Sequence, residues 1–528
     1  MIIVFIIIGL LLSGAIAWFF ESKIKHFARV FSLFSVASIL VLFVYDTLFA
    51  DHSSNEKFSQ FTPIIRLDWI KSLNIEFALG LDQLSIILVI LTLFLALICV
   101  LVSWHEIKTK VGFYYFNLLA SIAGIIGVFT AIDMFLFFFF WEIMLLPITA
   151  IIAIWGHEQR HFAAIKFFIF TQVSSLIMLI AIISMAYIHY QQMGQLSFYY
   201  PDWQKLILDP TTGYYLMLGF FIAFAVKLPS VPVHSWLPDA HTQAPTAGSV
   251  LLAGVLLKTG AYGLIRFVIL LFPAASQEFA PIASILGVTS ILYGAKMAFA
   301  QQDFKRLVAY SSISHMGFVM LALFSFNAIA YQGAILTMVA HGLSSAALFS
   351  LAGMIYSRIH SRSLADMGGF WLSAPRMGGF ALAFAAAAFG LPGLANFIGE
   401  FFSLVGAYQS FPVVVMFAAL GLIGSAIYGM VMFQNSFQGQ AKCQVADFSI
   451  RENIVAGSLL LLLIFFGLFP NTVLSKINWQ ASWQATNNRD SNRDSNRLSQ
   501  SGTASQAQFK NVVLAKKSFN KVRSTSDE

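Results

Sequence analysis

Charged side chains are scarce in this sequence. Of its 528 residues only 10% are Asp, Glu, Lys or Arg, whereas 58% are hydrophobic, and the mean hydropathy is +0.78. A water-soluble globule needs more polar surface than this composition supplies. The composition therefore excludes a soluble protein and predicts that lipid is the solvent for most of the chain.

Cysteine is also rare. The two cysteines, Cys99 in an apolar run and Cys443 in a polar stretch, are too far apart in the sequence to indicate a local metal or redox motif. The chain has no Gly-rich phosphate loop and no closely spaced His and Cys ligands. We therefore expect no cofactor and no metal in this chain. Its basic residues are scattered rather than gathered with aromatic residues, which argues against nucleic-acid binding.

Long apolar runs, by contrast, recur almost without pause up to Pro470. Each is long enough to cross a bilayer as a helix. They predict an all-α, polytopic membrane bundle of about fourteen transmembrane helices, forming one domain over residues 1–470. The runs lie near residues 2–20, 28–50, 83–104, 112–131, 134–155, 163–188, 213–229, 249–271, 281–300, 305–324, 327–356, 376–402, 411–435 and 452–470.

The remaining segment, 471–528, differs in composition. It is rich in Ser, Asn and Gln and contains the repeat Asn488-Arg489-Asp490-Ser491 followed by Asn492-Arg493-Asp494-Ser495. Too few large apolar residues are present to build a core. We expect a disordered polar C-terminal tail.

The basic residues divide unevenly between alternate loops. The odd-numbered loops hold Lys23, Lys25, Arg29, Lys108, Lys110, Arg160, Lys166, Lys305, Arg306, Arg358, Arg362, Arg376, Lys442 and Arg451, and the even-numbered loops hold Lys57, Arg66, Lys71 and Lys205. The positive-inside rule then places the odd loops in the cytoplasm and both chain termini on the outer side. The tail argues against an outer C-terminus, because it has nine basic residues and four acidic ones, although much of it lies far from the last span.

Two of the predicted spans are interrupted. In the seventh, Lys227 is followed by Pro229 and Pro232, and proline both lacks a backbone donor and clashes with the preceding turn. In the twelfth, the stretch 389–400 carries Pro392 and several glycines ahead of Glu400. Broken helices at membrane depth are tolerated only inside protein or beside water, and a pair of them points to repeats with a working site between them. The breaks are five spans apart, as two inverted five-helix repeats require.

Four ionisable residues fall within predicted spans: Glu142, Lys227, Lys258 and Glu400. A charge at the centre of a bilayer costs a few kcal/mol even on the most lenient scale, so such residues are candidates for function. Two of them adjoin the breaks, which favours proton transfer across the membrane. The competing interpretation is that they form two structural ion pairs that serve packing alone.

Histidines accompany these charges. His315 has serines beside it, and His341 has serines one turn on, so hydroxyl groups are available to orient each imidazole or to hold water. Each is also compatible with a simple interhelical hydrogen bond. We place His234 and His241 at a cytoplasmic entrance. The carboxylates near predicted span ends, Asp46, Asp82 and Asp133, are interpreted as interfacial.

Longer motifs give the sequence a resemblance to a known family, the antiporter-like membrane subunits of respiratory complex I. Within that group it is most similar to subunit M, the bacterial counterpart of mitochondrial subunit 4, over nearly all of residues 1–470. The motifs are Trp141-Glu142 with Pro147, Trp155-Gly156-His157, Ala163-Ala164-Ile165-Lys166-Phe167-Phe168, Lys227-Leu228-Pro229, His234-Ser235-Trp236-Leu237-Pro238-Asp239-Ala240-His241, and the run from Ala244-Pro245-Thr246 to Lys258.

The resemblance implies a fourteen-helix fold with two inverted repeats and a proton channel. It makes Glu142 and Lys227 a pair between the fifth and seventh helices, Lys258 the central relay, and Glu400 the terminal group on the twelfth helix. His234, His315 and His341 match positions of linking polar residues. The sister subunits L and N, and the Mrp-type sodium/proton antiporters, typically carry lysine where this chain has Glu400.

The implied function is that of a membrane-arm subunit of a proton-pumping NADH:quinone oxidoreductase in a bacterial inner membrane. FMN, iron–sulfur clusters and quinone would then reside in partner subunits, and L and N would be neighbours in the bilayer. Two alternatives stay open: an Mrp-type monovalent cation/proton antiporter subunit, and a structural membrane subunit that does not pump.

Overall fold

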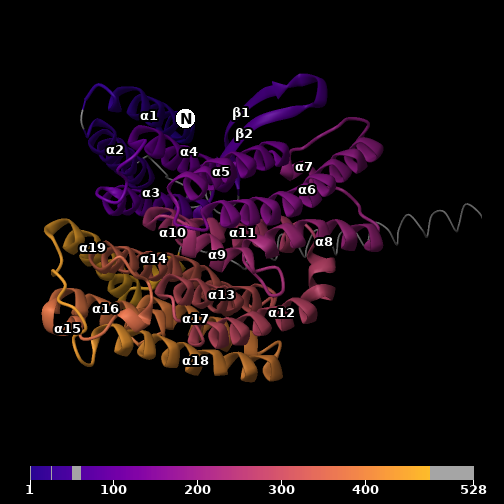
Figure 1. The fold of residues 1–528 in the computed structure, drawn as a ribbon. Coiled ribbons are helices and arrows are strands. Elements are labelled where there is room, and N and C mark those ends of the chain that lie inside the picture. Colours follow the sequence, from indigo (N-terminus) through magenta and orange to yellow (C-terminus); the bar gives the residue numbers. More distant parts are fainter. Residues whose placement is uncertain (1, 25, 50–60, 476–528) are drawn as a thin grey trace, which may run out of the picture. The chain divides into compact units, whose positions relative to one another are not determined.

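Helices make up nearly all of the structure, a computed structural model that describes residues 2–24, 26–49 and 61–475 (Figure 1). The elements are α1 (Ile2–Glu21), α2 (Phe27–Phe49), β1 (Thr62–Ile70), η1 (Lys71–Leu73), β2 (Ile75–Leu81), α3 (Gln83–Ser103), α4 (Val111–Thr130), α5 (Met134–Trp155), α6 (Arg160–Met193), α7 (Tyr200–Trp203), α8 (Pro210–Lys227), α9 (Trp236–Gln243), α10 (Thr246–Leu251), η2 (Leu252–Leu256), α11 (Leu257–Gly263), η3 (Leu264–Ile269), α12 (Pro273–Phe299), α13 (Phe304–Leu323), α14 (Ala328–Ile359), η4 (Leu364–Asp366), α15 (Phe370–Ser373), α16 (Pro375–Ala388), α17 (Ala395–Tyr408), α18 (Pro412–Phe437), α19 (Ile450–Leu468) and α20 (Asn471–Leu474).

Twelve helices of the described chain are long and apolar enough to cross a membrane without interruption. The element that runs from α10 through η2 and α11 to η3 counts as one of them. Two further crossings are each made of two shorter helices, α8 with α9 and α16 with α17. These are the seventh and twelfth crossings, and they bring the total to fourteen. The predicted all-α membrane bundle of about fourteen helices is therefore confirmed, and both breaks lie at the prolines where the sequence predicted them.

The connections between spans meet at two opposite ends of the bundle. Contacts among odd-numbered connections and the adjoining helix ends include Arg29 to Ile107 O, Glu106 to Thr246 N, His157 N to Gln243 O, and the ion pairs of Arg362 with Asp303 and Arg358 with Glu452. Contacts among even-numbered connections include Asn74 to Leu196 O, Met134 N to Phe198 O, Ser410 to Ser325 O, and the pair of Arg266 with Asp82. We call these two ends the odd end and the even end. Such pairing is what fourteen alternating crossings require.

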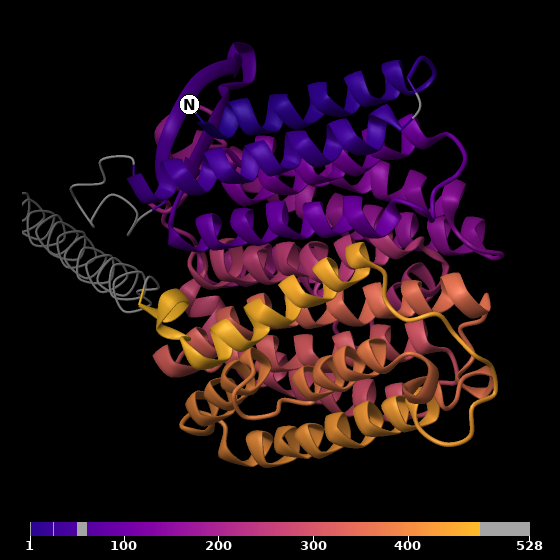
Figure 2. The same ribbon diagram turned by 90° about the vertical axis from the view of Figure 1, so that its left-hand side faces the viewer.

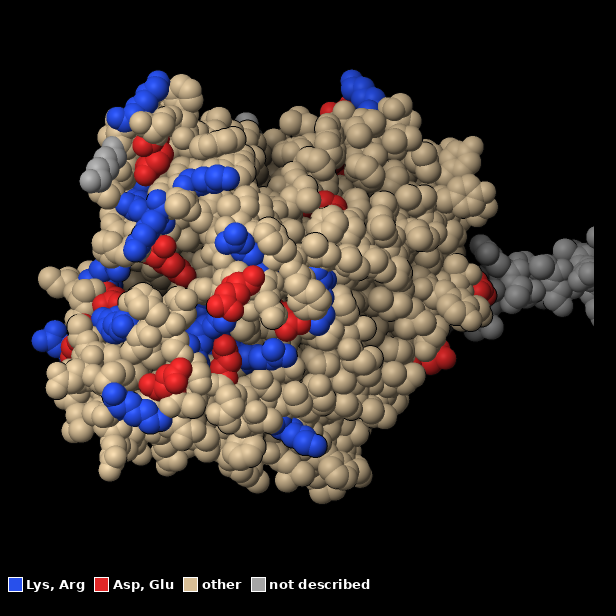
Figure 3. Space-filling view, viewed as in Figure 1, with Lys and Arg blue, Asp and Glu red and all other residues tan. Residues whose placement is uncertain are grey.

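Charge is distributed unequally between the two ends. Figure 3 shows Lys and Arg gathered with Asp and Glu at one end of the molecule, on the side where α15 and α19 lie in Figure 1, while most of the remaining surface is uncharged. Large apolar side chains lie outward on the peripheral helices, such as Phe34 at 75% exposure and Leu461 at 64%. In water this surface would be costly, whereas hydrocarbon solvates it well.

Glycine at positive φ shapes the twelfth crossing. α16 ends at Ala388, and Gly390 and Gly393 adopt φ angles of +76° and +95° before α17 begins at Ala395. These backbone angles strain any residue with a Cβ. The break therefore depends on glycine as well as on Pro392, and it sets Glu400 in the second turn of α17.

The two breaks occupy equivalent places in two consecutive blocks of five crossings. α4, α5 and α6 precede the broken α8–α9 and the α10–η3 crossing, just as α12, α13 and α14 precede the broken α16–α17 and α18. Consecutive crossings alternate in direction, and the blocks start five crossings apart. Equivalent helices therefore run in opposite directions, as expected of inverted repeats.

A β-hairpin between α2 and α3 was not predicted. β1 and β2 are antiparallel, and Arg66 pairs with Glu76 across them. The alternation of Leu67 and Trp69 with polar neighbours is a strand signal that a search for spans passes over. The predicted tail, 471–528, lies outside the described residues beyond Ser475, as do Lys25 and Lys57.

Candidate functional site

Lys258 lies at the centre of the site. It is fully buried, near the midpoint of the eighth crossing, on α11. Its Nζ donates to Ala253 O at 2.5 Å and lies 2.8 Å from Nδ1 of His341 on α14. An ammonium group at this depth is costly in hydrocarbon and needs such partners.

Local backbone geometry supplies one of those partners. α11 is flanked by two π-helical stretches, η2 and η3, and Ala253 belongs to η2. In a π-helical turn the backbone bonds shift by one residue, which leaves carbonyl groups out of the regular α-helical ladder and is common at functional sites. Within this stretch the carbonyl of Ala253, five residues before Lys258, accepts from the lysine side chain.

From Lys258 a row of polar side chains continues through three helices. The ring centroids of His341 and His315 on α13 are 5.4 Å apart. Nδ1 of His315 lies 2.5 Å from Oε1 of Glu400 on α17, and Tyr428 OH on α18 lies 3.3 Å from its Nε2. His315, His341 and Glu400 are at most 2% exposed. The structure thus brings together two of the four predicted charged residues and two of the three predicted relay histidines in one buried row. We call this the relay row: Lys258, His341, His315 and Glu400.

Glu142 and Lys227 lie beside one another without forming an ion pair within 4.0 Å in the described structure. Oε1 of Glu142 accepts from Ser175 of α6 at 2.6 Å. The buried Nζ of Lys227 has no hydrogen-bond partner among the described residues and lies over the rings of Trp141, at 5.4 Å, and Phe167, at 5.3 Å. Aromatic faces attract a cation, and the charge of Glu142 acts electrostatically on Lys227.

His234 stands apart from the relay row. It lies between α8 and α9, is 6% exposed, and packs edge-on against Tyr293 with centroids 4.9 Å apart. Its Nδ1 has no hydrogen-bond partner among the described residues. His241, on α9, is fully buried and stacks on Phe349 with centroids 4.5 Å apart. Both therefore sit inside the seventh crossing rather than in an open loop.

The serines beside the two relay histidines donate hydrogen bonds to backbone carbonyls. Ser312 donates to Val308 O, and Ser344 donates to His341 O while accepting from Asn396. Serine at such positions in a membrane helix commonly bonds to a carbonyl one turn earlier. The partners of His315 are instead Glu400 and Tyr428, from distant parts of the chain.

Some neighbours of the site were missed from the sequence. Ser175 and Tyr428 each contact a predicted residue, and Trp141 with Phe167 surrounds Lys227. Tyr428, the single tyrosine of α18, is the one signal in the sequence for this group. Asp82 and Asp133, interpreted as interfacial, begin α3 and α5 as N-caps that accept backbone hydrogen bonds.

A close helix approach ties Lys258 to the seventh break. An added Cβ on Gly260 would lie 2.7 Å from Leu228 N and 2.8 Å from Phe224 O. Both atoms belong to the backbone, which cannot move aside as a side-chain tip can. The absence of a side chain at Gly260 therefore lets α11 touch the chain just where α8 ends at Lys227.

Substitution of Gly260 by alanine tests this approach. We expect it to destabilise the membrane domain by about 1–3 kcal/mol, the usual cost of overpacking, and to lower the apparent melting temperature of the purified subunit in detergent. Gly457→Ala on α19 is the matched control, since a Cβ there meets nothing within 4 Å. Equal melting temperatures for the two variants would show that α8 and α11 are free to separate.

No group of three or more His, Cys, Asp or Glu side chains that could hold a metal ion is found within residues 2–24, 26–49 and 61–475. The polar groups of the relay row are single donors and acceptors on separate helices. Their arrangement suits the passage of protons between neighbours.

Known proteins share both this sequence and this fold. The family model described as NADH:quinone oxidoreductase/Mrp antiporter, transmembrane, matches residues 131–427. NADH-quinone oxidoreductase subunit M of Pseudomonas aeruginosa is 46% identical over 487 residues, which cover 90% of this chain and 95% of that protein. Subunit M of Escherichia coli K12 is 50% identical over 418 residues, covering 77% and 82%.

A solved structure agrees with these sequence relatives. One chain of respiratory complex I from Thermus thermophilus with bound NADH has a TM-score of 0.82 and 28% identity, covering 93% of this chain and 99% of its own. The chain therefore belongs to the NADH-quinone oxidoreductase subunit M family of antiporter-like membrane proteins.

Proposed function

We propose that this chain is a membrane-arm subunit of an NADH:quinone oxidoreductase and that it carries protons across the bilayer through the relay row. The observation that carries the proposal is the buried sequence of contacts from Lys258 through His341 and His315 to Glu400. Four ionisable groups placed at such depth are costly. A purely structural role for them is better served by apolar residues.

The Glu142 and Lys227 side chains form the input of the path. Moving these two charges together or apart changes the electric field at the end of α8. That end lies against α11, because Gly260 of α11 has no side chain there. Two unit charges about 4 Å apart interact with about 4 kcal/mol at an effective dielectric constant of about 20. Each 1.4 kcal/mol is a tenfold change in equilibrium, so the pair can shift the proton affinity of Lys258 and reverse the direction of transfer.

Beyond Lys258, the proton passes by way of His341 and His315 to Glu400 and then to the outer face. Imidazole accepts a proton at one nitrogen and releases one at the other, which suits a link between fixed donors and acceptors. Water can bridge the wider steps where polar groups line them. His234, within the seventh break, lies on the entry side of this path.

Quinone reduction in other subunits supplies the energy. FMN, iron–sulfur clusters and quinone belong to those partner subunits, and the sister subunits L and N are the neighbours in the membrane. Basic residues concentrate at the odd end, so that end faces the cytoplasm of a bacterial cell. Both α1 and α19 then have their outer ends, at Ile2 and Leu468, on the periplasmic side of the inner membrane.

An Mrp-type antiporter subunit is the principal competing function. It would exchange cations without a redox partner. The carboxylate of Glu400 argues for the respiratory complex, since its contact with His315 gives the path a proton acceptor at its end where the antiporters typically have lysine.

Substitution of His341 by glutamine tests the path. Glutamine keeps hydrogen bonding but cannot carry a proton, so we expect NADH-driven proton uptake by proteoliposomes containing the complex to fall about tenfold. The loss is bounded because water can replace part of the imidazole's role. His161→Gln, at an exposed position on α6, is the control. Wild-type proton uptake in the assembled His341→Gln complex would remove the relay row from the pathway.

A further inference from the structure

A polar cavity of about 530 Å³ opens at the odd end, away from the relay row. It lies where α3 ends, α10 begins, α14 ends and α19 begins, four elements that come together in Figure 1. Its volume is within the range of about 300–1,000 Å³ that is usual for ligand sites. None of the residues assigned to proton transfer lines it.

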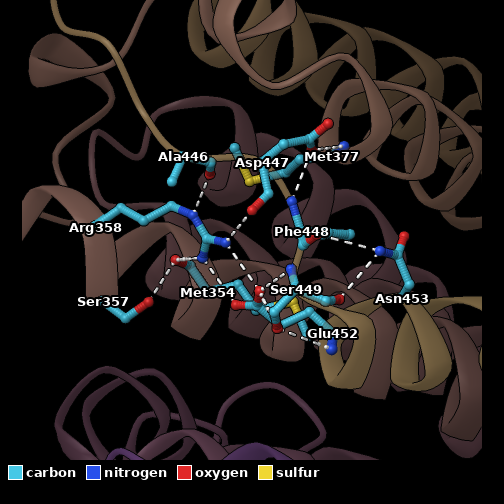
Figure 4. A network of polar contacts seen from close by, with 10 residues as sticks. All are labelled: Met354, Ser357, Arg358, Met377, Ala446, Asp447, Phe448, Ser449, Glu452 and Asn453. Atoms are coloured by element: carbon cyan, nitrogen blue, oxygen red, sulfur yellow. Dashed lines mark hydrogen bonds and ion pairs between the residues drawn. The ribbon is translucent and has the colours of Figure 1, made fainter.

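Both carboxylates in the wall are already occupied by protein partners. Glu106 accepts from the backbone N and the hydroxyl of Thr246 at 2.9 and 3.0 Å. Glu452 forms a two-pronged ion pair with Arg358, at 2.8 and 2.9 Å, and caps the start of α19 through Ser449. Figure 4 shows Arg358 and Glu452 pointing toward one another, with backbone carbonyls of 446 and 447 completing the guanidinium's contacts.

The cations of the wall, by contrast, lack partners. No carboxylate of the described residues lies within 4.0 Å of the charged groups of Arg451 or Lys108, and Nη1 of Arg451 is buried without a hydrogen-bond partner there. The hydroxyl of Ser350, a residue only 2% exposed, is likewise unpartnered in the described structure. With Glu452 paired to Arg358 and Glu106 hydrogen-bonded to Thr246, the donors of Arg451, Lys108 and Ser350 remain available to a ligand.

A histidine at the rim of the cavity is consistent with a lining that offers hydrogen-bond donors to an anion. The pKa of His105 is lowered, chiefly by partial desolvation and then by the nearby charge of Arg451. The imidazole is therefore neutral near pH 7 and can donate one hydrogen bond without adding to the repulsion between the cations.

Apolar side chains also line the cavity, which lies beside the lipid-facing surface of α19. Leu101 of α3 and Val455 of α19 line the cavity. α19 lies on the outside of the bundle, crossing it as the yellow helix in Figure 2. Its residues Ile450 and Ile454, on either side of Arg451, are 82% and 58% exposed. A ligand with a charged head and a hydrocarbon tail matches such a wall.

We propose that this cavity binds the phosphate group of a membrane phospholipid. Arg451 and Lys108 contact the phosphate oxygens, as basic pockets between membrane helices do for lipid headgroups. Leu101 and Val455 contact the start of an acyl chain. Because α3, α14 and α19 all border the cavity, the bound lipid joins the first part of the bundle to its last helix.

The test uses the complex containing this chain, reconstituted in phosphatidylcholine nanodiscs that include a phosphatidylglycerol with a photoreactive acyl chain. After illumination, we expect crosslinked peptides from residues 101–108 and 450–455, and we expect at least a fivefold loss of that product in Arg451→Gln. Arg376→Gln, an exposed basic residue at the same end, is the control and leaves the product unchanged.

Further arms distinguish the source of the phosphate and guard against misfolding. Lys108→Gln, an exposed side chain whose loss leaves the fold intact, is expected to reduce the product severalfold. Excess inorganic phosphate leaves the crosslink in place if the ligand is a lipid. Displacement by inorganic phosphate, or full crosslinking in both Arg451→Gln and Lys108→Gln, would overturn the proposal.

Discussion

Replacement of Lys258 by methionine is expected to lower the rate of proton translocation by the assembled complex by about 100-fold, the lower end of the range for a positioned acid–base group. Methionine has a similar length and no titratable group. Lys258 is fully buried and contacts His341 directly, so its removal separates the relay row from the seventh break. Proton uptake by proteoliposomes driven by NADH measures the effect.

Stability distinguishes this loss from misfolding. A buried ammonium group is expensive to desolvate, and exchanging it for an apolar side chain of similar size is often neutral or stabilising. We therefore expect Lys258→Met to assemble and to melt at or above the wild-type temperature. If Lys258 were a packing residue, proton uptake would instead persist in this variant.

The control for this variant is another lysine of the same membrane domain. Lys296, near the end of α12, is exposed and has no ion-pair partner among the described residues. Lys296→Met is expected to translocate protons at the wild-type rate. A similar loss in both variants would mean that any change of charge in this domain disturbs the complex.

Much of the fold could be predicted because membrane-spanning helices are recognised in a sequence by the length and apolarity of their runs. Each span requires about twenty apolar residues, and proline interrupts a helix wherever it falls inside one. Pro229 and Pro392 accordingly located the two breaks. The ends were less certain, since α6 extends to Met193 where the apolar run stops near 188.

Other features depend on contacts that no local pattern encodes. The π-helical stretches η2 and η3 arise where the eighth crossing, an apolar run without proline, packs at full burial against its neighbours. Such long-range choices override local propensity.

The candidate site, like the fold, could be predicted from the sequence only in part. Buried charges stand out in an apolar sequence, so Lys258 and Glu400 could be singled out by cost alone. His315 and His341 were also named, but which charge each contacts could not be predicted, because the paired residues lie 83 and 85 positions apart along the chain. The sequence made the serines available to orient the histidines, whereas in the structure they donate to backbone carbonyls.

Substitution of Glu142 by glutamine is expected to abolish coupling, with NADH oxidation and proton uptake falling together by more than tenfold in a complex that still assembles. Glu142 supplies the charge that acts on Lys227, whose Nζ lies over the faces of Trp141 and Phe167 and has no hydrogen-bond partner among the described residues. Charges about 6 Å apart interact with about 3 kcal/mol at an effective dielectric constant of about 20, equivalent to about 100-fold in equilibrium. Glutamine removes that interaction but keeps the hydrogen bond from Ser175.

Two companion variants identify what Glu142 contributes. Glu142→Asp keeps the charge on a shorter side chain and is expected to retain part of the activity, while Glu278→Gln, at an exposed position on α12, is expected to leave both rates unchanged. Assembly is measured on the same samples. In the proposed function electron transfer occurs in other subunits, so its loss together with proton uptake would show that the field at Lys227 gates the coupled cycle. Unchanged rates in Glu142→Gln would make Glu142 a packing residue and favour a structural subunit that does not pump.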